Sequence, residues 1–323
     1  MKAIVYDRYG PPDVLRLVEV EKPVAAPGQV LVRVHGAAVN PYDWHFMRGK
    51  PYFLRLVSGL RAPKRDRLGV DFAGVVEAVG PEVTTVKVGD EVYGMQTGAF
   101  AQYLCAPESS VAPKPRMLDF SLAAAIPLAG LTALQGLRNS ARLQAGERVL
   151  IIGASGGVGT FAVQIAEHLG ARVTGVCSTG NLDGVKALGA NAVIDYTRED
   201  FTATAEKFDV VFQLGGMDSP ARCRRALTQR GRLVLCSGDS EGAWIGPLGR
   251  FMQAPLMSPF VKQKLMGLEA KRSREDLVEL ARLVDEGALR PIIDRSYPLA
   301  EAADAVRYVE GGHARGKVLV QID

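Results

Sequence analysis

A glycine-rich turn near the middle of the chain constrains this sequence more than any other feature. Val149–Ile152 is a run of four apolar residues, which is the length of one buried strand of a parallel sheet. The turn from Gly153 to Gly159 follows, and apolar residues then recur at helical spacing as far as Leu169. Gly170 stands where a helix usually ends. A strand, a glycine turn and a helix in this order are the parts of a dinucleotide-binding crossover.

The glycines of this turn are expected to have separate tasks. Gly156 lets the backbone approach a pyrophosphate, and Gly159 lets the helix pack closely on the strand. The start of the helix presents N–H groups and its positive dipole end to the phosphates. The alternative is a turn that serves only close packing in an ordinary α/β domain. The predicted cofactor-binding loop consists of Ala154, which replaces the first glycine of G-x-G-x-x-G, and of Ser155, Gly156, Gly157, Val158 and Gly159.

Strands and helices alternate after this crossover. We expect strands at 172–177, 192–195, 209–212 and 232–236. Helices are expected between them, including 182–188 and 221–227. This alternation indicates an α/β fold with a parallel, doubly wound sheet.

The end of the second predicted strand indicates which nicotinamide cofactor is bound. NAD-selective sites usually place a carboxylate there to hold the ribose hydroxyls. This strand ends Cys177-Ser178-Thr179-Gly180-Asn181, which offers hydroxyls and an amide but no acid. A neutral, donor-rich end tolerates a 2′-phosphate and therefore favours NADPH. The same polar residues also suit a helix N-cap and a turn, and the two roles are compatible.

Length and composition predict a two-domain protein of the cytoplasm. A chain of 323 residues exceeds what one core normally holds. Its 47% hydrophobic and 23% charged residues are those of a globular protein, and a net charge of +4 does not imply nucleic acid. No apolar run has the length of a membrane span, and the first ten residues do not resemble a secretory signal. The four cysteines show no paired spacing, which suits reduced thiols.

The two ends of the chain are rich in β structure. The first hundred residues form short β-rich runs separated by proline and glycine, which predicts a partly open antiparallel barrel. The pattern becomes helical near Ser121, and β texture returns after Leu289. We therefore expect residues 1–121 and 288–323 to form one domain, and residues 122–287 to form the nucleotide-binding domain.

Several motifs together resemble one known family over essentially the whole chain. The matching segments are Val39-Asn40-Pro41-x-Asp43, Gly69-x-Asp71-x-x-Gly74-x-Val76-x-x-Val79-Gly80, Gly89-Asp90-x-Val92, the Ala154–Gly159 loop and Asp195-Tyr196. The chain resembles zinc-independent members of the medium-chain dehydrogenase/reductase superfamily, in the quinone oxidoreductase-like branch. The resemblance implies a GroES-like β-barrel domain and a Rossmann domain with the active site in the cleft between them. It also implies NADPH-dependent reduction of quinones or α,β-unsaturated carbonyls.

No metal site is expected. Zinc-dependent relatives need a cysteine near the position of Asn40 and a Gly-His-Glu motif where this chain has Gly69-Val70-Asp71. Valine has no ligating atom, and the four histidines are scattered along the sequence. Without a Lewis acid, reduction of a conjugated acceptor is easier than oxidation of a simple alcohol, because charge spreads into an enolate or a quinol.

Further cofactor contacts are implied by the resemblance. Thr132 is expected beside the nicotinamide carboxamide, and Cys177, Ser178, Asn181 and Tyr196 near the adenosine 2′-phosphate. Close relatives often carry arginine where this chain has Gly180, so the contact with the 2′-phosphate is either weakened or passed to Arg198 or Lys186. Arg315 and Lys317 offer a phosphate contact near the C-terminus, with a solvated pair as the alternative. The ends of the fourth and fifth strands supply Leu214, Gly215, Cys236, Ser237 and Gly238.

The candidate catalytic residues are Asn40, Asp43, His45 and Tyr52, in the loop that relatives place over the nicotinamide. Tyr52 or His45 would donate a proton to an enolate oxygen, and Asn40 would orient the carbonyl. The alternatives are that Asp43 only bonds backbone N–H groups in its turn, that Tyr52 only lines the pocket, and that solvent supplies the proton.

The C-terminal part of the predicted nucleotide-binding domain bears on assembly. Residues 244–266 are apolar with few charges, which suits a pocket wall, a dimer face or a membrane-surface element. Residues 265–270 are expected to form an edge strand, and many relatives pair such a strand across a two-fold axis. We therefore expect a homodimer.

The sequence leaves three functions open. The prediction is metal-free, NADPH-dependent hydride transfer to a small-molecule quinone or enone. One alternative is an NADPH-dependent aldehyde or carbonyl reductase, or a zinc-free alcohol dehydrogenase. The other is a non-catalytic NADPH-binding protein for sensing or interaction.

Overall fold

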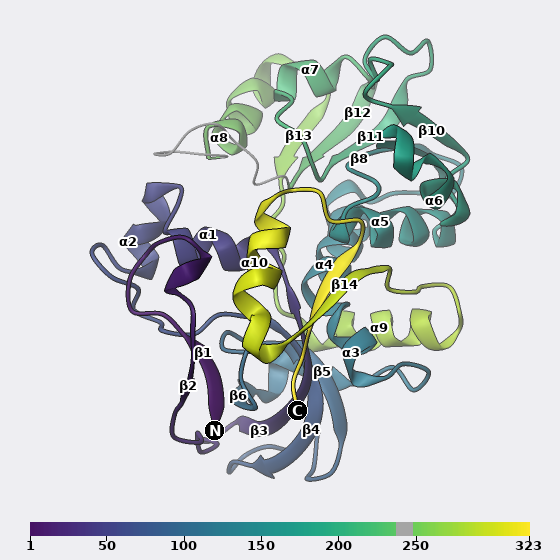
Figure 1. Cartoon of the computed structure of the whole chain (residues 1–323). Helices are drawn as coiled ribbons and strands as arrows, with labels where there is room; N and C mark the ends of the chain where they lie inside the picture. The colour runs from purple at the N-terminus through teal and green to yellow at the C-terminus, as the bar shows by residue number, and fades with distance from the viewer. Residues whose placement is uncertain (237–247) are drawn as a thin grey trace. The chain divides into compact units, whose positions relative to one another are not determined.

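The chain divides into two compact units. The computed structural model describes residues 1–236 and 248–323 (Figure 1). The first unit contains residues Met1–Leu131 and Arg272–Asp323, and the second contains Thr132–Lys271. Both boundaries differ from the expected ones, 121 and 288. The predicted cofactor residues Ser237 and Gly238 lie outside the described residues.

The second unit is built on a six-stranded sheet in which every described strand pair is parallel. The strand order is β10-β9-β8-β11-β12-β13, so the first strand in the chain lies next to the fourth. This is the 3-2-1-4-5-6 order of a doubly wound dinucleotide-binding sheet, which confirms the predicted fold class. The strands are β8 (Arg148–Ile152), β9 (Arg172–Cys177), β10 (Ala192–Asp195), β11 (Phe208–Gln213), β12 (Leu227–Leu235) and β13 (Lys264–Gly267).

The helices of this unit follow the strands as predicted, with one exception. The predicted helix at 221–227 ends earlier, because Leu227 pairs with Phe208 and already belongs to β12. Gly170, directly after the cap of α5, has φ +76, which suits the glycine expected at that helix end. The helical segments are η4 (Gln135–Ala141), α5 (Gly157–His168), η5 (Thr179–Asn181), α6 (Leu182–Ala187), α7 (Pro220–Arg224), α8 (Leu248–Met257) and η6 (Ser258–Phe260).

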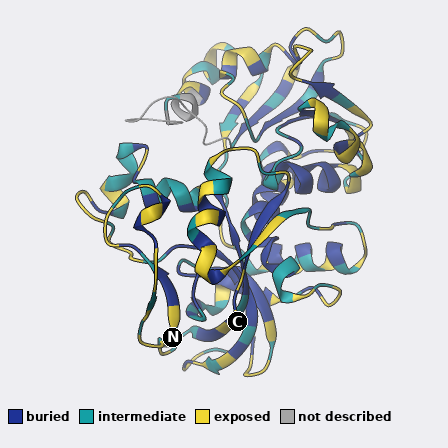
Figure 2. Cartoon of the chain, viewed as in Figure 1, coloured by how far each residue is buried: buried dark blue, intermediate teal, exposed yellow. Residues whose placement is uncertain are grey.

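The core of the second unit forms on the apolar strands. Leu150, Val211 and Leu233 come from three neighbouring strands, and each is completely buried. Burying side chains on both faces of a strand explains the continuous apolar runs 149–152 in β8 and 210–212 in β11. The dark blue strands in Figure 2 show this burial.

The first unit contains a seven-stranded sheet and a β1-β2 hairpin. Its strand order is β14-β15-β3-β4-β5-β7, with β6 also paired to β3. The pairs are antiparallel except β14 with β15. Strand bounds are β1 (Lys2–Val5), β2 (Arg16–Glu19), β3 (Gln29–Val39), β4 (Asp71–Val79), β5 (Glu91–Met95), β6 (Tyr103–Pro107), β7 (Val111–Pro113), β14 (Ile293–Pro298) and β15 (Lys317–Gln321).

One helix of the first unit, α9, explains why the boundary expected at 288 lies earlier in the chain. Tyr93 on β5 donates a hydrogen bond from its hydroxyl to the carbonyl of Leu277, which ties α9 to the sheet of this unit. The helical segments are η1 (Pro12–Val14), α1 (Pro41–Arg48), η2 (Tyr52–Leu54), α2 (Arg55–Ser58), η3 (Glu108–Ser110), α3 (Phe120–Ala124), α4 (Pro127–Leu134, whose last three residues count with the second unit), α9 (Arg274–Asp285), η7 (Leu299–Glu301) and α10 (Ala302–Glu310). Among the described residues, no helix combines the length and apolar character that crossing a membrane requires.

Candidate functional site

The carboxyl ends of β8 and β11 meet where the strand order of the parallel sheet reverses. The backbone N–H of Leu214 donates to the carbonyl of Ile152 at 2.9 Å. A Cβ placed on Gly153 would lie 2.9 Å from the nitrogen of Gly215, so the loop after β8 and the loop after β11 run close together. The N–H of Cys236 in turn donates to Gln213. Open α/β sheets bind their ligands at this switch point.

The glycines of the loop between β8 and α5 differ in their surroundings. A Cβ on Gly159 would overlap the carbonyl oxygen of Gly153 and lie 2.7 Å from the carbonyl carbon of Ala154, so no side chain fits. A Cβ on Gly156 would meet only the Gly153 oxygen, at 3.5 Å, so space remains beside this residue. Gly159 is therefore needed for packing, whereas Gly156 leaves room beside the backbone.

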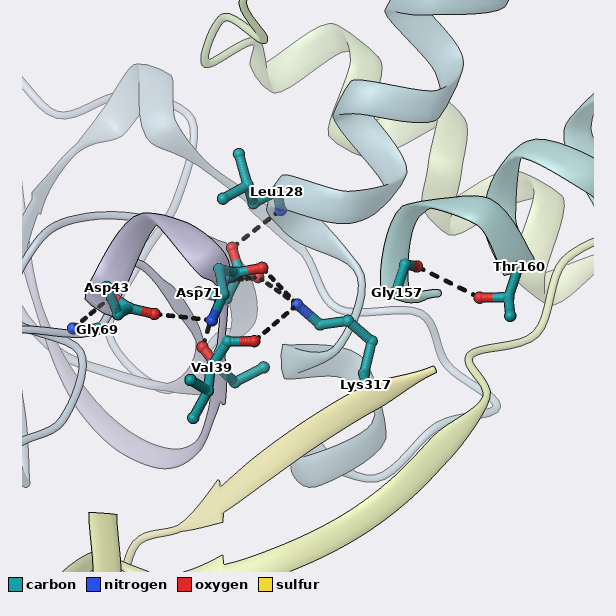
Figure 3. Close-up of polar contacts among 10 residues, drawn as sticks. Val39, Asp43, Gly69, Asp71, Leu128, Gly157, Thr160 and Lys317 are labelled. Carbon is teal, nitrogen blue, oxygen red and sulfur yellow. Dashed lines mark hydrogen bonds and ion pairs between the residues drawn. The ribbon is translucent and has the colours of Figure 1, made fainter. Parts of the chain in front are cut away.

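The N-terminus of α5 supplies the groups that an anion needs. Gly156 is the N-cap, and the N–H groups of the first turn have no carbonyl acceptor within the helix. Thr160 directs its hydroxyl to the carbonyl of Gly157 at 3.3 Å, within the first turn (Figure 3). Ser155, Gly157 and Val158 are partly exposed, whereas Ala154 is buried under the turn. These residues fit a pyrophosphate at the start of the helix.

The ends of β9 and β10 form a polar edge. Ser178 accepts a hydrogen bond from the Asn181 side chain at 2.9 Å, and both residues are partly exposed. Tyr196 is 62% exposed and its N–H donates to the carbonyl of Cys177, so the two strand ends are adjacent. Cys177 itself is buried, which leaves its neighbours to contact a ligand.

An acid that the sequence analysis did not count lies at this edge. The carboxylate of Asp195 accepts hydrogen bonds from the hydroxyls of Thr179 at 2.5 Å and Thr197 at 2.7 Å. These bonds, with the charge of Arg198 at 3.7 Å, lower the pKa of Asp195 below its usual value. The carboxylate is therefore ionised, and both of its oxygens already accept hydrogen bonds. The signal in the sequence was an acid ending the third strand rather than the second.

A second polar cluster lies inside the first unit. Val318 pairs with Val39, and Asp71 pairs with Ala38, so the ends of β15, β3 and β4 lie at one level of the sheet. This register brings Lys317, Asn40 and Asp71 together, although the sequence separates them by up to 277 positions. All three are at least 97% buried. Figure 3 shows the Lys317 ammonium directed at Asp71.

The Asn40 side chain is committed to this cluster. Its Nδ2 donates to Asp71 Oδ2 at 2.9 Å and to the carbonyl of Ala38 at 3.3 Å. Its Oδ1 accepts from the Lys317 ammonium at 2.5 Å. Both amide donors are in use, so the structure directs the amide of Asn40 away from the predicted task of orienting a substrate carbonyl.

Asp43 caps the start of α1. Its two oxygens accept from the backbone N–H groups of Asn40 at 2.8 Å and Gly69 at 3.1 Å. Complete burial raises the pKa of the Asp43 carboxyl to about 7, against the lowering effect of these bonds. The alternative reading of Asp43 as a group that bonds backbone N–H groups describes these contacts. These contacts indicate that Asp43 positions the start of α1.

His45 and Tyr52 are the partly exposed members of the predicted catalytic set. His45 Nδ1 lies 2.9 Å from the carbonyl of Lys50, and its ring stacks on Trp44. A carbonyl only accepts, so Nδ1 carries the proton and neutral His45 has no proton on Nε2. The ring of Tyr52 packs against the Arg55 guanidinium, 4.9 Å from its centre.

The remaining predicted cofactor residues are divided between the two units. Thr132 is buried in α4, and Leu214 and Gly215 are half-buried beyond β11. Lys317 lies in the interior of the first unit, with Asp71 as its charge partner. The sequence analysis named Asp71 only as part of a motif. Its signal was a carboxylate within the apolar run GVDFAGVV, which predicts a buried partner.

The cluster does not fit zinc. Val70, at the position of the histidine in zinc-dependent relatives, is buried and has no donor atom. The oxygen of Asn40 is bonded to an ammonium, whose charge would repel a metal cation. Within residues 1–236 and 248–323, no three His, Cys, Asp or Glu side chains are grouped as a metal site requires.

Comparisons with known proteins agree with this architecture. Residues 26–116 match the protein-family model described as alcohol dehydrogenase GroES-like domain. Residues 188–320 match the family model described as zinc-binding dehydrogenase. The quinone oxidoreductase of Coxiella burnetii has a solved structure with a TM-score of 0.88 and 34% identity, covering 100% of this chain and 99% of that one.

Two curated relatives extend the match. The chain is 35% identical to a 2-methylene-furan-3-one reductase of Solanum lycopersicum and 34% identical to a chloroplastic NADPH-dependent alkenal/one oxidoreductase of Arabidopsis thaliana. Each match covers 99% of this chain and 79% of the relative. Fold, glycine loop and relatives define a two-domain protein of the dehydrogenase/reductase type. The chain belongs to the medium-chain dehydrogenase/reductase family, in its quinone oxidoreductase-like branch.

Proposed function

We propose that this protein is an NADPH-dependent oxidoreductase that reduces a quinone or an α,β-unsaturated carbonyl without a metal. The observation that carries the proposal is the glycine loop at the switch point of the parallel sheet, where Gly159 has no room for a side chain and Gly156 leaves space for a phosphate. The relatives named for alkenal/one and quinone reduction support the acceptor class.

The chain's own residues would hold the cofactor in two places. The first turn of α5 binds the pyrophosphate through its backbone N–H groups. Ser178, Asn181 and Tyr196 bind the 2′-phosphate at the ends of β9 and β10, and Arg198 adds positive charge there. Thr132, Leu214, Gly215 and Cys236 complete the site. When bound, NADPH supplies a hydride to the acceptor.

The buried cluster of the first unit orients the segment that precedes α1, and its partly exposed neighbours meet the substrate. His45 donates a proton only in its charged form, because its neutral form is protonated on Nδ1. We assign the ring of Tyr52 to a contact with the acceptor. Quinols and enolates protonate readily, so we assign the proton to solvent rather than to an obligatory side chain.

The donor set supports the proposal of metal independence. An amide bonded to an ammonium and a valine stand at the positions of two zinc ligands of related enzymes. A conjugated acceptor spreads the developing charge over its own atoms, so it needs no Lewis acid. The family model described as zinc-binding dehydrogenase matches residues 188–320, which include neither Asn40 nor Val70.

The decisive experiment is oxidation of NADPH and of NADH by purified, chelator-treated protein, with one quinone and one linear enone. We expect rapid NADPH oxidation that the chelator does not slow. Loss of activity on chelation, restored by zinc, would refute metal independence. Preference for NADH would refute the assignment of Ser178 and Asn181. Cofactor binding without turnover would favour a sensor, and reduction of simple aldehydes alone would favour a carbonyl reductase.

We further propose a cytoplasmic homodimer. The four cysteines carry no disulfide among the described residues, which suits a reducing compartment. Strand β13 ends the six-stranded sheet, and an edge strand of this kind offers backbone groups to a second copy. Light scattering of the purified protein tests the dimer, and a monomer at micromolar concentration would exclude it.

A further inference from the structure

The ammonium of Lys317 has its contacts inside the protein. Nζ lies 2.5 Å from Asn40 Oδ1, 3.4 Å from Asp71 Oδ2 and 3.4 Å from the carbonyl of Val39. An ammonium has three donors, and these three acceptors match them. The side chain is 3% exposed. Lys317 therefore does not fit the phosphate contact expected from its place near the C-terminus.

The arrangement fixes which way the Asn40 amide points. Lysine only donates hydrogen bonds, and an ionised carboxylate only accepts them. The amide oxygen must therefore face Lys317, and the amide nitrogen must face Asp71. A flipped amide would place two donors face to face on one side and two acceptors on the other. The lysine and the aspartate thus select one orientation.

Asp71 extends this order to a second helix. Its Oδ2 accepts from Asn40, while its Oδ1 accepts from the backbone N–H of Leu128 at 2.9 Å. Leu128 is the second residue of α4, which also carries Thr132. Asn40 is the N-cap of α1, held there by Asp43. One buried ion pair therefore fixes the starts of α1 and α4.

We infer that Lys317, paired with Asp71, is a positioning residue that sets the orientation of Asn40 and thereby of the α1 segment carrying His45. The inference rests on the proposed function, in which that segment meets the substrate. It assigns Lys317 to the turnover step rather than to cofactor affinity. Charge is essential, because a neutral side chain would leave Asp71 buried without a cation.

Side-chain amide exchange measures this role without any turnover. The sequence contains four asparagines, so protein labelled with ¹⁵N-asparagine gives four side-chain amide pairs in an NMR spectrum. An Asn40→Asp variant assigns the signal of Asn40. We expect this signal to exchange with deuterated water at least tenfold more slowly than those of Asn139, Asn181 and Asn191. Lys317→Met should remove most of this protection, and Lys317→Arg should retain more of it.

Kinetics separate positioning from a phosphate contact. Lys317→Met should lower kcat at least tenfold and change the dissociation constant of NADPH, measured by fluorescence, less than threefold. Lys87→Met is the control, because Lys87 is exposed in a loop of the same unit. A rise in the NADPH dissociation constant with unchanged kcat would overturn the inference.

A double variant separates positioning from charge balance. Lys317→Met with Asp71→Asn removes both charges, so the melting temperature should recover relative to Lys317→Met alone. We expect Asn40 exchange to stay fast and kcat to stay low. Recovery of kcat together with stability would overturn the inference. Absence of turnover in the wild-type protein would refute the proposed function, whereas the exchange experiment would still decide the role of Lys317.

Discussion

The glycine loop of the second unit and the buried cluster of the first solve opposite problems. The loop prepares a site for charge by removing side chains, because Gly159 lets α5 pack closely on the strand and Gly156 leaves room beside the backbone N–H groups. The cluster instead fills its space with charged side chains, and Lys317, Asn40 and Asp71 satisfy one another. The glycine loop is built to receive an anion, whereas the polar groups of the buried cluster already have their partners within the protein.

This difference teaches where each region is sensitive. An empty backbone site fails when atoms are added, because an added side chain overlaps the backbone. A satisfied buried ion pair fails when atoms are removed, because the remaining charge has no partner and no water. Substitutions that add and remove atoms therefore test the two regions separately.

The largest expected effect comes from removing Asp71. Asp71→Ala leaves the Lys317 ammonium buried without its carboxylate and removes the acceptor for the N–H of Leu128. Breaking a buried pair on one side costs about 3–5 kcal/mol. A chain of this length should then melt about 10 °C lower. Differential scanning calorimetry measures the shift.

The matched control is an ion pair at the surface of the same unit. Asp7 contacts Arg16 at 2.6 Å, with 65% and 58% of the two side chains exposed. Asp7→Ala should cost about 0–1 kcal/mol. Equal shifts for Asp71→Ala and Asp7→Ala would show that burial does not matter to the cluster.

The next effect concerns the loop. In Gly159→Ala the added Cβ overlaps the carbonyl of Gly153, so α5 must move away from β8. Overpacking of this kind costs about 1–3 kcal/mol, and displacement of the helix start should weaken NADPH binding about 100-fold. Fluorescence titration gives the affinity. Gly184→Ala is the control, because nothing lies within 4 Å of its added Cβ and α6 should gain up to about 1 kcal/mol.

The same contrast explains what the sequence could predict. The loop is local: Gly153, Gly156 and Gly159 lie within seven positions, and their spacing implies both the turn and the helix start. Parallel pairing and fold class followed from the alternation around it. The unit boundaries shifted, because α9 joins the first unit through a hydrogen bond from Tyr93 that no local pattern announces.

The buried cluster could be predicted only in part. Asn40 and Asp43 were selected as site residues because they lie in one short motif, but their partners depend on the register of β15, β3 and β4. Lys317 was expected to contact a phosphate, since its sequence neighbours do not show that it faces Asp71. Long-range pairing therefore determined the roles, while local motifs determined only the candidates.

The pH dependence of stability tests the electrostatics of Asp43. Its pKa of about 7 lies above the ordinary value of 3.8, so the folded protein holds this proton more tightly than the unfolded chain. The contribution of Asp43 to the free energy of unfolding is full at low pH and falls as the pH rises from 3.8 to about 7. Above pH 7 it stays constant. One pKa unit corresponds to about 1.4 kcal/mol, so the loss should exceed about 1 kcal/mol.

Comparison with Asp43→Asn isolates this dependence. The variant loses one acceptor at every pH but lacks the titration, so the difference in melting temperature from the wild type should be larger at pH 5 than at pH 8. A difference that grows with pH would mean that ionised Asp43 is the stabilising form.

The smallest expected effect distinguishes NADPH from NADH at the polar edge of the second unit. Arg198 is 73% exposed and lies 3.7 Å from Asp195, whose carboxylate is already occupied by two threonines. Its charge is therefore available to a 2′-phosphate, and an exposed contact of this kind contributes about 1 kcal/mol. Arg198→Ala should weaken NADPH binding about fivefold and leave NADH binding unchanged. Arg172→Ala, at the opposite end of β9, should change neither; equal losses for both cofactors would assign Arg198 to the fold of the edge rather than to the phosphate.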